Sequence, residues 1–223
     1  MEAPKKSSRG SRSEDHPIVR ITPVDWKAQG KVTSVKDQGQ CGSCWAFAAL
    51  AVVESSHLIK SSTTYDLSEQ QMVNCVRNNY NGCNGGWMDW VYNYMLSSNQ
   101  GVKTESQVPY SGSYSSCPNG HGGSVKIASF QTSPNKKCGK LRNLVKKAPA
   151  SVALCANSAF QNYGSGVFKR CNRFCSINHA VVVTGYTANK HWQIKNSWGT
   201  SWGVNGYMTL RRGNKCKICN YGG

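Results

Sequence analysis

The chain has 223 residues, 39% of them hydrophobic, and a formal net charge of +17. This hydrophobic share is enough for a packed core and excludes a wholly disordered chain, and no apolar run reaches the about 20 residues that cross a bilayer. All ten acidic residues precede residue 106, so residues 1–105 carry a charge of +1 and residues 106–223 carry +16. That asymmetry predicts two distinct structural parts and favours a polyanionic partner.

The amino-terminal part predicts a tail followed by a central helix. Residues 1–20 are basic and Ser-rich without the apolar core of a signal peptide, so we expect a flexible tail there. An Ala- and Leu-rich run without Gly or Pro predicts a buried helix over 44–60. The Gly-rich run QGQCGSC before it cannot be helical. Cys44 therefore lies in the first helical turn, where unpaired N–H groups favour an anion.

The rest of the chain changes from helical patterns to strand patterns. Further helices are expected from Ser68, with Gln71 as its capping partner, and over 86–96. After about residue 120 the hydrophobic period becomes two, which is typical of strands. Candidate strands cover 125–130, 151–155, 167–169, 179–187, 191–196 and 206–211, and a basic helix is expected over 140–147.

The predicted fold class is therefore α+β, with two domains behind the tail over 1–20. We expect a mainly helical domain over 21–122 that carries the nucleophile. A β-rich, acid-free domain is expected over 123–223.

Eleven cysteines favour an oxidising compartment and a set of disulfides. Zinc is the alternative, because Cys41 with Cys44 and Cys216 with Cys219 have the spacing of zinc ligands. The other cysteines are scattered singly through Gly-rich loops, as disulfide cysteines are. We therefore expect no metal and no cofactor, and the odd count leaves one thiol over.

A predicted hairpin brings a histidine and an asparagine together. A turn over 187–190 joins two candidate strands, and in an antiparallel hairpin the numbers of paired residues then sum to about 377. His179 and Asn196 nearly meet this condition and should lie opposite each other at the open end. An Asn carbonyl beside an imidazole fixes its tautomer and orientation, which is the third role in a nucleophile–base–orienter triad.

Cys44 supplies the missing nucleophile. The helix N-terminus and a neighbouring imidazolium both favour its thiolate. Gln38, in the loop before the helix, could direct its side-chain amide to the same place and form an oxyanion hole with the Cys44 backbone N–H. These groups together predict acyl transfer through a thioester, followed by hydrolysis.

The motifs around these residues resemble those of papain-like cysteine proteases, in particular the cathepsin L-like subfamily. CGSCW matches the family signature around the nucleophile, with His and Asn about 130–150 residues downstream. Further matching runs are LSEQQMVNC, GCNGGWM, NHAVVVTGY and WQIKNSWGTSWGVNGY. The resemblance extends over nearly the whole chain from Ile21. It implies the two-domain papain-like fold, with a helical domain, an antiparallel β-barrel-like domain and the active site in the cleft between them.

The resemblance implies a role for each matching position. It makes Cys44 the nucleophile, His179 the base and acid, Asn196 the orienter and Gln38 the oxyanion donor. Trp198 would shield the contact between His179 and Asn196. Trp198 is also implied in substrate binding, and the backbone of Gly85 and Gly86 would pair with an extended substrate. The pocket for the second side chain before the cut would be lined by Met88, Ala153, Ala180 and Tyr221. Asn178, where many relatives carry Asp, is the last implied substrate-binding position.

The small Ala153 and Ala180 imply that this pocket prefers a bulky apolar side chain, and Tyr221 would shorten it. The resemblance also implies the disulfides Cys41–Cys83 and Cys75–Cys117, and a third from Cys171 or Cys175 to Cys216. Two more are expected, for instance Cys138–Cys155 and a second link to Cys219.

The expected protein is a mature, monomeric endopeptidase of the secreted or lysosomal/vacuolar route. Its implied partners are protein and peptide substrates, its own inhibitory prodomain and cystatin-type inhibitors. Two other functions remain open. One is an inactive relative used for binding, although all four catalytic positions are filled here. The other is a basic protein that binds polyanions such as sulfated glycans, through pairs such as Arg211 and Arg212.

Overall fold

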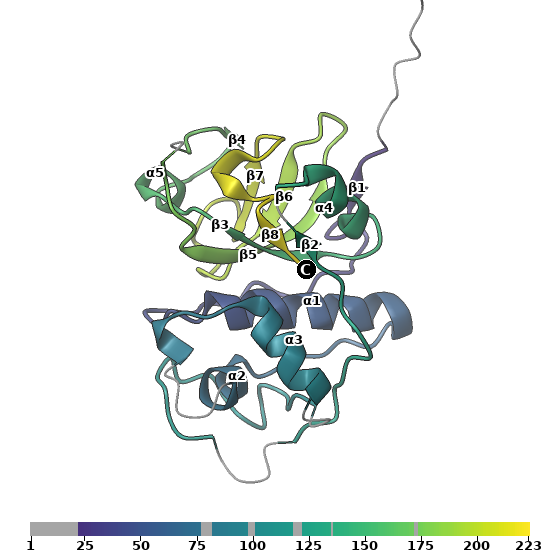
Figure 1. Ribbon diagram of the computed structural model, residues 1–223, viewed down its shortest axis with the longest axis vertical. Coiled ribbons are helices and arrows are strands. Elements are labelled where there is room, and N and C mark those ends of the chain that lie inside the picture. The colour runs from purple at the N-terminus through teal and green to yellow at the C-terminus, as the bar shows by residue number, and fades with distance from the viewer. Residues whose placement is uncertain (1–21, 77–81, 98–100, 118–121, 135, 172–173) are drawn as a thin grey trace, which may run out of the picture.

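The computed structural model describes residues 22–76, 82–97, 101–117, 122–134, 136–171 and 174–223. The predicted tail over 1–20 lies outside the described residues. Helices form one half of the molecule and a sheet with short helices forms the other, and α1 lies along the boundary between them (Figure 1). The α+β class predicted from the sequence is confirmed.

The helical half contains α1 (Cys44–Ser61), α2 (Glu69–Cys75), the 3₁₀ helix η1 (Gly82–Asn84) and α3 (Met88–Ser97). The start of α2 follows the prediction, because Ser68 Oγ accepts a hydrogen bond from the Gln71 backbone N–H at 3.0 Å. The Gln71 side chain makes a different contact from the one expected of a capping partner. Its Oε1 accepts from the Lys103 N–H at 2.8 Å and so holds the next loop against α2.

In the described ranges the sheet half contains eight strands and three short helical segments. The strands are β1 (Val24–Asp25), β2 (Ser133–Pro134), β3 (Ala150–Leu154), β4 (Val167–Phe168), β5 (His179–Tyr186), β6 (Trp192–Lys195), β7 (Tyr207–Leu210) and β8 (Tyr221–Gly222). The helical segments are α4 (Cys138–Val145), α5 (Ser158–Gln161) and η2 (Lys215–Lys217).

The strands pair in the order β2-β8-β3-β5-β6-β7-β4, and β1 pairs with β5. Of these pairs only β4–β7 is parallel, so the sheet is mixed, and among the described residues its two ends do not meet in a closed barrel. β1 comes from the amino-terminal part of the chain, with Val24 opposite Tyr186. The first residues described therefore belong to the sheet rather than to the helical half.

Both faces of β5 are buried, which explains why its eight residues are apolar almost throughout. Ala180 and Val182 pack into the cluster formed with α1, α2 and α3. Val181 and Val183 point to the opposite face and pack with α4 and Phe160. β5 thus joins two hydrophobic cores, and it begins at His179 on the boundary between them.

One predicted strand is wrong. Residues 125–130 alternate between apolar and polar, yet only Val125 pairs there, in an isolated bridge with Val102. Ile127 and Phe130 pack against the core from an irregular connection between the halves, and Phe130 lies against Tyr92. The alternation reflects one buried face of this connection without strand partners for its backbone.

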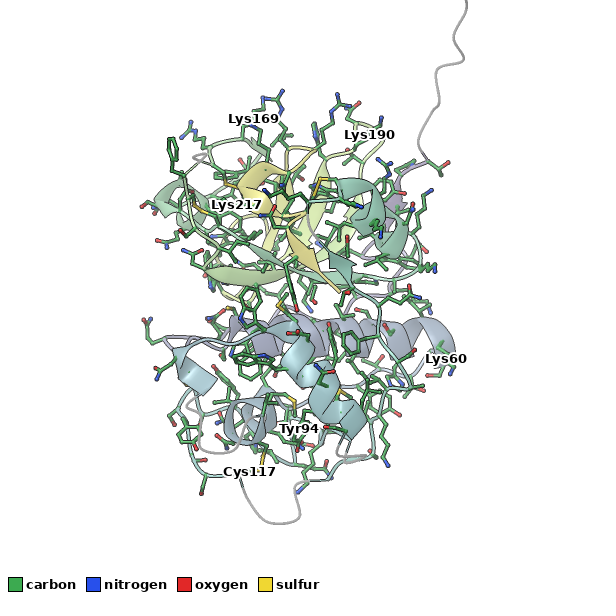
Figure 2. All side chains as sticks on the ribbon, viewed as in Figure 1. Lys60, Tyr94, Cys117, Lys169, Lys190 and Lys217 are labelled. Carbon is green, nitrogen blue, oxygen red and sulfur yellow. A yellow bond between two sulfur atoms is a disulfide. The ribbon has the colours of Figure 1, made fainter. Side chains whose placement is uncertain are left out.

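Ten of the eleven cysteines form disulfides, which excludes the zinc alternative for those spacings. Cys41–Cys83 and Cys75–Cys117 are as expected, and Cys117 lies at the outer edge of the helical half (Figure 2). Cys216 pairs with Cys171, one of its two candidates. The suggested Cys138–Cys155 bridge is wrong. A further link to Cys219 does form, but its partner is Cys138, because the end of the chain folds back beside α4, and Cys155 pairs with Cys175.

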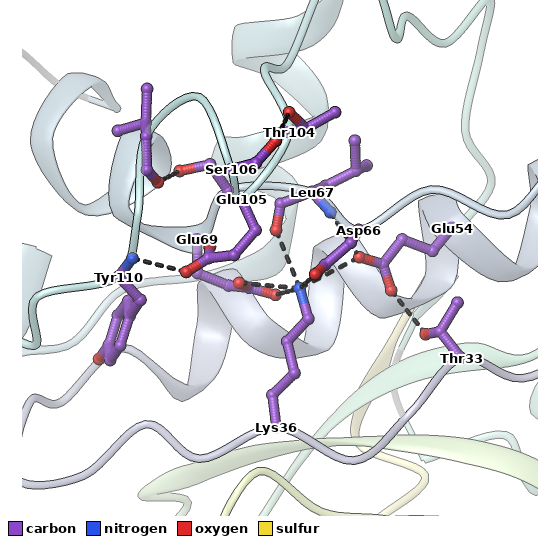
Figure 3. A network of polar contacts seen from close by, with 12 residues as sticks. Thr33, Lys36, Glu54, Asp66, Leu67, Glu69, Thr104, Glu105, Ser106 and Tyr110 are labelled. Atoms are coloured by element: carbon purple, nitrogen blue, oxygen red, sulfur yellow. Dashed lines mark hydrogen bonds and ion pairs between the residues drawn. The ribbon is translucent and has the colours of Figure 1, made fainter.

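A buried polar network joins the two halves behind α1. Lys36 Nζ lies 2.9 Å from Glu69, 3.2 Å from Glu54 and 2.7 Å from Asp66 (Figure 3). Burial alone would lower the pKa of Lys36, but these carboxylates raise it above its ordinary value. The ammonium therefore stays charged and balances acidic groups that would be costly to bury alone.

The network continues into the sheet through Thr33. Its hydroxyl donates to Glu54 at 2.6 Å and accepts from Lys195 Nζ at 3.2 Å. Lys195 is the last residue of β6, and Glu54 lies in α1. These contacts fix the strand that ends just before Asn196 relative to the helix that begins at Cys44.

None of the helices in the described ranges has the length and hydropathy needed to cross a membrane.

Candidate active site

Cys44 is the one cysteine outside the disulfides, and it is the first residue of α1. Burial raises the pKa of its thiol, and contacts with the backbone at Ala180, Trp45 and Cys44 itself act in the opposite direction. The side chain is thus half-buried, with backbone N–H groups directed towards the sulfur. A thiolate there needs a further positive charge close by.

His179 and Asn196 meet as the hairpin predicts. Val182 pairs with Lys195 and Val183 with Ile194, which is the predicted register, and a bulge before Gly185 shifts the pairs nearer the turn by one residue. At the open end His179 Nε2 lies 2.8 Å from Asn196 Oδ1.

The orientation of the Asn196 amide fixes the imidazole tautomer. Its Oδ1 also accepts the Ser197 backbone N–H at 2.9 Å, so the oxygen and not the nitrogen must face both donors. His179 Nε2 therefore carries a proton, and Nδ1 is the basic nitrogen of the neutral ring. The Nδ2 of Asn196 is buried and has no hydrogen-bond partner among the described residues.

Trp198 covers this pair of side chains. Its ring stacks on His179 with the centroids 4.4 Å apart, and its edge packs against Phe160. His179 is only 6% exposed. Burial lowers the pKa of its imidazole to about 4, although the hydrogen bond to Asn196 acts in the opposite direction. Without a neighbouring negative charge, the imidazole of His179 is thus neutral at physiological pH.

Four hydrogen bonds hold Gln38, one of them from its backbone N–H to the Ser197 carbonyl at 2.9 Å. Its Nε2 donates to the Cys41 carbonyl at 3.0 Å, and its Oε1 accepts from Ser197 Oγ at 2.8 Å. The hydroxyl of Tyr110 donates to its backbone carbonyl at 2.8 Å. One side-chain N–H remains for a further acceptor. Ser197 and Tyr110 are positioning residues that the sequence analysis did not name; the place of Ser197 directly after Asn196 was the available signal.

One pocket brings most of the predicted groups together. Cys44 and His179 line it with Gln38 and Trp198, and Gly85 and Asn178 contribute at its sides. Asn178 Oδ1 accepts from the Ala156 N–H at 2.8 Å, which ties this wall to the end of β3. The pocket is also lined by residues that were not predicted, namely Gly42, Cys83, Asn84, Ala156 and Gln161.

The predicted specificity residues do not line that pocket. Met88, Ala153 and Ala180 are each at least 96% buried in the core beside it. Ala153 lies between Ala180 and Tyr221 on neighbouring strands, so these three residues share one row across the sheet. Tyr221 also packs against Trp87, with the ring centroids 4.9 Å apart. The row forms an apolar wall near the site and ends at an aromatic ring.

The two predicted glycines differ in what requires them. Gly85 has a φ of +98° and nothing within 4 Å of the place a Cβ would occupy, so open space lies above a backbone that favours glycine. A Cβ on Gly86 would lie 2.6 Å from the Trp45 ring, so its small size is needed for packing. Only Gly85 lines the pocket.

Comparisons with known proteins agree with this geometry. Residues 21–222 match the papain family cysteine proteases. Cysteine proteinase COT44 of Brassica napus is 40% identical over 196 residues, which are 85% of this chain and 59% of that protein. The chain thus spans less than two thirds of that relative.

Two solved structures share the fold. The bromelain protease from Ananas comosus, in complex with the E64 inhibitor, has a TM-score of 0.82 at 40% identity, covering 90% of this chain and 96% of that one. The digestive procathepsin L2 proteinase from Tenebrio molitor has a TM-score of 0.83 at 33% identity, covering 93% of this chain and 69% of that one.

Proposed function

Since the chain belongs to the papain family of cysteine proteases, we propose that it is an endopeptidase that cleaves peptide bonds with Cys44 as nucleophile. The observation that carries the proposal is that His179, held by Asn196 at 2.8 Å, lines the same pocket as the one free thiol. Residues 21–122 supply Cys44 and Gln38, and residues 123–223 supply the other two groups.

The first step is transfer of the Cys44 thiol proton to His179. Nδ1 accepts it, because Nε2 already donates to Asn196. Burial disfavours a charge on either group alone, so the ion pair depends on the attraction between thiolate and imidazolium. Asn196 holds the ring in place without adding a negative charge that would compete with the thiolate for it.

The thiolate then attacks the carbonyl carbon of the scissile bond. The oxyanion accepts hydrogen bonds from the free N–H of the Gln38 side chain and from the Cys44 backbone. His179 returns its proton to the leaving amine as the C–N bond breaks, which leaves a thioester on Cys44. A water molecule gives a proton to His179 and attacks the thioester, and the acid product leaves with the thiolate restored.

We further propose a preference for a bulky apolar side chain two positions before the cut. What supports it is the composition of the row beside the pocket: Ala180 and Ala153 are small and apolar, and the row ends at the aromatic ring of Tyr221. Five disulfides support a secreted or lysosomal/vacuolar location. An inhibitory prodomain is the proposed natural partner, as in a procathepsin.

The experiment is cleavage of a fluorogenic peptide with Leu at that position, before and after alkylation of the native protein. We expect one added group by intact mass, on Cys44, and complete loss of cleavage. His179→Ala should abolish cleavage as well, whereas His57→Ala, at a half-buried position near the end of α1 and outside the pocket, is the matched control. Cleavage that survives full alkylation would contradict the proposal, and a folded protein without any cleavage would favour the inactive relative.

A further inference from the structure

The acid-free half contains a second pocket, of about 570 Å³, whose charged residues are all cations. Those that line it are Arg142, Lys190, Arg211, Arg212 and Lys215. They come from α4, from the turn between β5 and β6, from the end of β7 and from η2. Lys190 is on the outer side of the sheet half in Figure 2. The fold thus gathers cations that are widely spaced in sequence around one hollow.

These five cations have no carboxylate partner among the described residues, where Lys36 makes the ion pairs instead. Like charges around a hollow repel one another and attract anions. Arginine presents a planar fork of donors that suits the oxygens of sulfate and phosphate groups. The charge of this pocket is therefore unbalanced within the described part of the chain.

The walls of the pocket are fixed in place. Cys138–Cys219 joins the start of α4 to the segment behind η2. Trp192 Nε1 donates to the Gly213 carbonyl at 3.2 Å, and the Arg212 N–H donates to His191 Nδ1 at the same distance. A site whose backbone is already held loses less entropy on binding than a flexible one.

Tyr186 supplies an independent sign that a ligand binds here. Its side chain lines the pocket and is 99% buried, and its hydroxyl has no hydrogen-bond partner in the part of the chain that the structure describes. Burial raises the pKa of this phenol, with Arg142 acting in the opposite direction. A buried hydroxyl without a partner is uncommon in native proteins. As a donor beside cations, it is complementary to an oxyanion.

The aromatic residues of the pocket argue against nucleic acid. Single strands bind by stacking their bases on open aromatic faces, but Trp192 is only 3% exposed and Tyr186 only 1%. A membrane surface would need apolar side chains beside the cations. The large hydrophobic residues exposed in the described ranges are Trp87, Leu96, Val167, Phe174 and Val204, and they do not line this pocket.

We propose that this basic pocket binds the sulfate groups of a sulfated polysaccharide. Such polymers are acidic, lack aromatic rings and occur in the oxidising compartments where a chain with five disulfides is stable. The pocket shares no lining residue with the pocket around Cys44. Polysaccharide binding and peptide cleavage are therefore separable, and the binding test does not rest on the proposed enzyme activity.

The test measures the Kd of the alkylated protein for a heparin decasaccharide by calorimetry at several salt concentrations. The pocket variant carries Arg142→Gln, Lys190→Gln and Arg212→Gln. The control carries Lys146→Gln, Lys169→Gln and Arg170→Gln, which removes the same charge from exposed positions outside the pocket. We expect the pocket variant to bind at least about 10-fold more weakly. The slope of log binding constant against log salt concentration, the salt slope, should become shallower by about 2. The control should lose less than about 3-fold.

A single substitution distinguishes binding in this pocket from general electrostatic attraction to the basic half. Tyr186→Phe removes only the hydroxyl, so we expect about 3- to 10-fold weaker binding with an unchanged salt slope. Equal losses in the two triple variants, or no effect of Tyr186→Phe, would overturn the proposal. So would equally tight binding of single-stranded DNA of the same charge or of phosphatidylserine vesicles. Thermal melting and peptide cleavage by the unalkylated variants report whether they are folded. Lys190→Gln alone, in the turn between β5 and β6, repeats the binding test with a single substitution.

Discussion

The imidazole of His179 lies against the indole of Trp198, with the ring centroids 4.4 Å apart and the planes inclined by 24°. This contact covers the hydrogen bond between His179 and Asn196 and excludes water from it. Excluding water strengthens that bond and at the same time makes a charged imidazole costly. The protonation state of His179 therefore depends on what Cys44 carries.

We expect the imidazole to titrate with a pKa near 4 when the thiol is absent. In Cys44→Ala no thiolate compensates for burial, and the pKa of His179 is lowered to about 4. In the unalkylated enzyme the proton taken from Cys44 should keep the ring charged at pH 6. Nitrogen-15 NMR of the ring distinguishes the two states. A neutral ring in both proteins at pH 6 would contradict the ion pair.

The same titration predicts how the stability of Cys44→Ala depends on pH. The unfolded imidazole has a pKa of about 6.5, so between pH 6.5 and 4 the unfolded chain binds a proton that the folded chain does not. The free energy of unfolding should therefore be highest above pH 6.5 and fall by at most about 3 kcal/mol as the pH drops through this window. Urea unfolding of Cys44→Ala and of Cys44→Ala/His179→Gln isolates this contribution, which the double variant should lack.

Asn196→Ala tests the orienting role. Without Oδ1 the imidazole can turn and change tautomer, so we expect kcat to fall by about 10²-fold with KM nearly unchanged. Asn196→Asp keeps the hydrogen bond and adds a charge, which should raise the pKa of His179. Steady-state cleavage across pH reports both effects. Asn189→Ala, in the exposed turn of the same hairpin, is the matched control, and an equal loss there would refute a specific role for Asn196.

Gln38 and Ser197 should act on one interaction. Gln38→Ala removes an oxyanion donor, and we expect kcat to fall by about 10²- to 10³-fold. Ser197→Ala removes the 2.8 Å contact to Gln38 Oε1, which should lower kcat by about 10-fold because the donor loses its orientation. In the double variant the Ser197 effect should vanish. If the two losses instead multiply, Ser197 does not act through Gln38.

The sequence predicts the interactions that depend on short-range rules. The Gly-rich run QGQCGSC ends at Cys44, which is where α1 begins. The hairpin places His179 beside Asn196 because the turn length sets the register of its strands. The odd cysteine count correctly indicates one free thiol. Each of these follows from local chain geometry or from simple counting.

Contacts between distant segments could not be predicted in the same way. Strand β8 has two residues and forms only because β2 and β3 lie on either side of it, and the Cys138–Cys219 pair depends on the same return of the chain. The basic pocket likewise requires α4, β7 and η2 to meet. The charge asymmetry indicated that cations gather in this half, but not where they form a hollow.

Tyr221→Ala tests the limit of the specificity wall. Tyr221 lies beside Ala153 in β3 and packs against Trp87, so removing the ring should lengthen the space available to the second side chain before the cut. We expect kcat/KM for peptides with Phe there to rise relative to Leu by about 10-fold or more, since one methylene group in such a pocket is worth about 1–3 kcal/mol. Ala153→Val, in the same row, should change the ratio in the opposite direction because the larger side chain reduces the space available to the substrate side chain. A ratio that stays constant in both variants would place the specificity pocket elsewhere, away from the row that Ala180, Ala153 and Tyr221 form across the sheet.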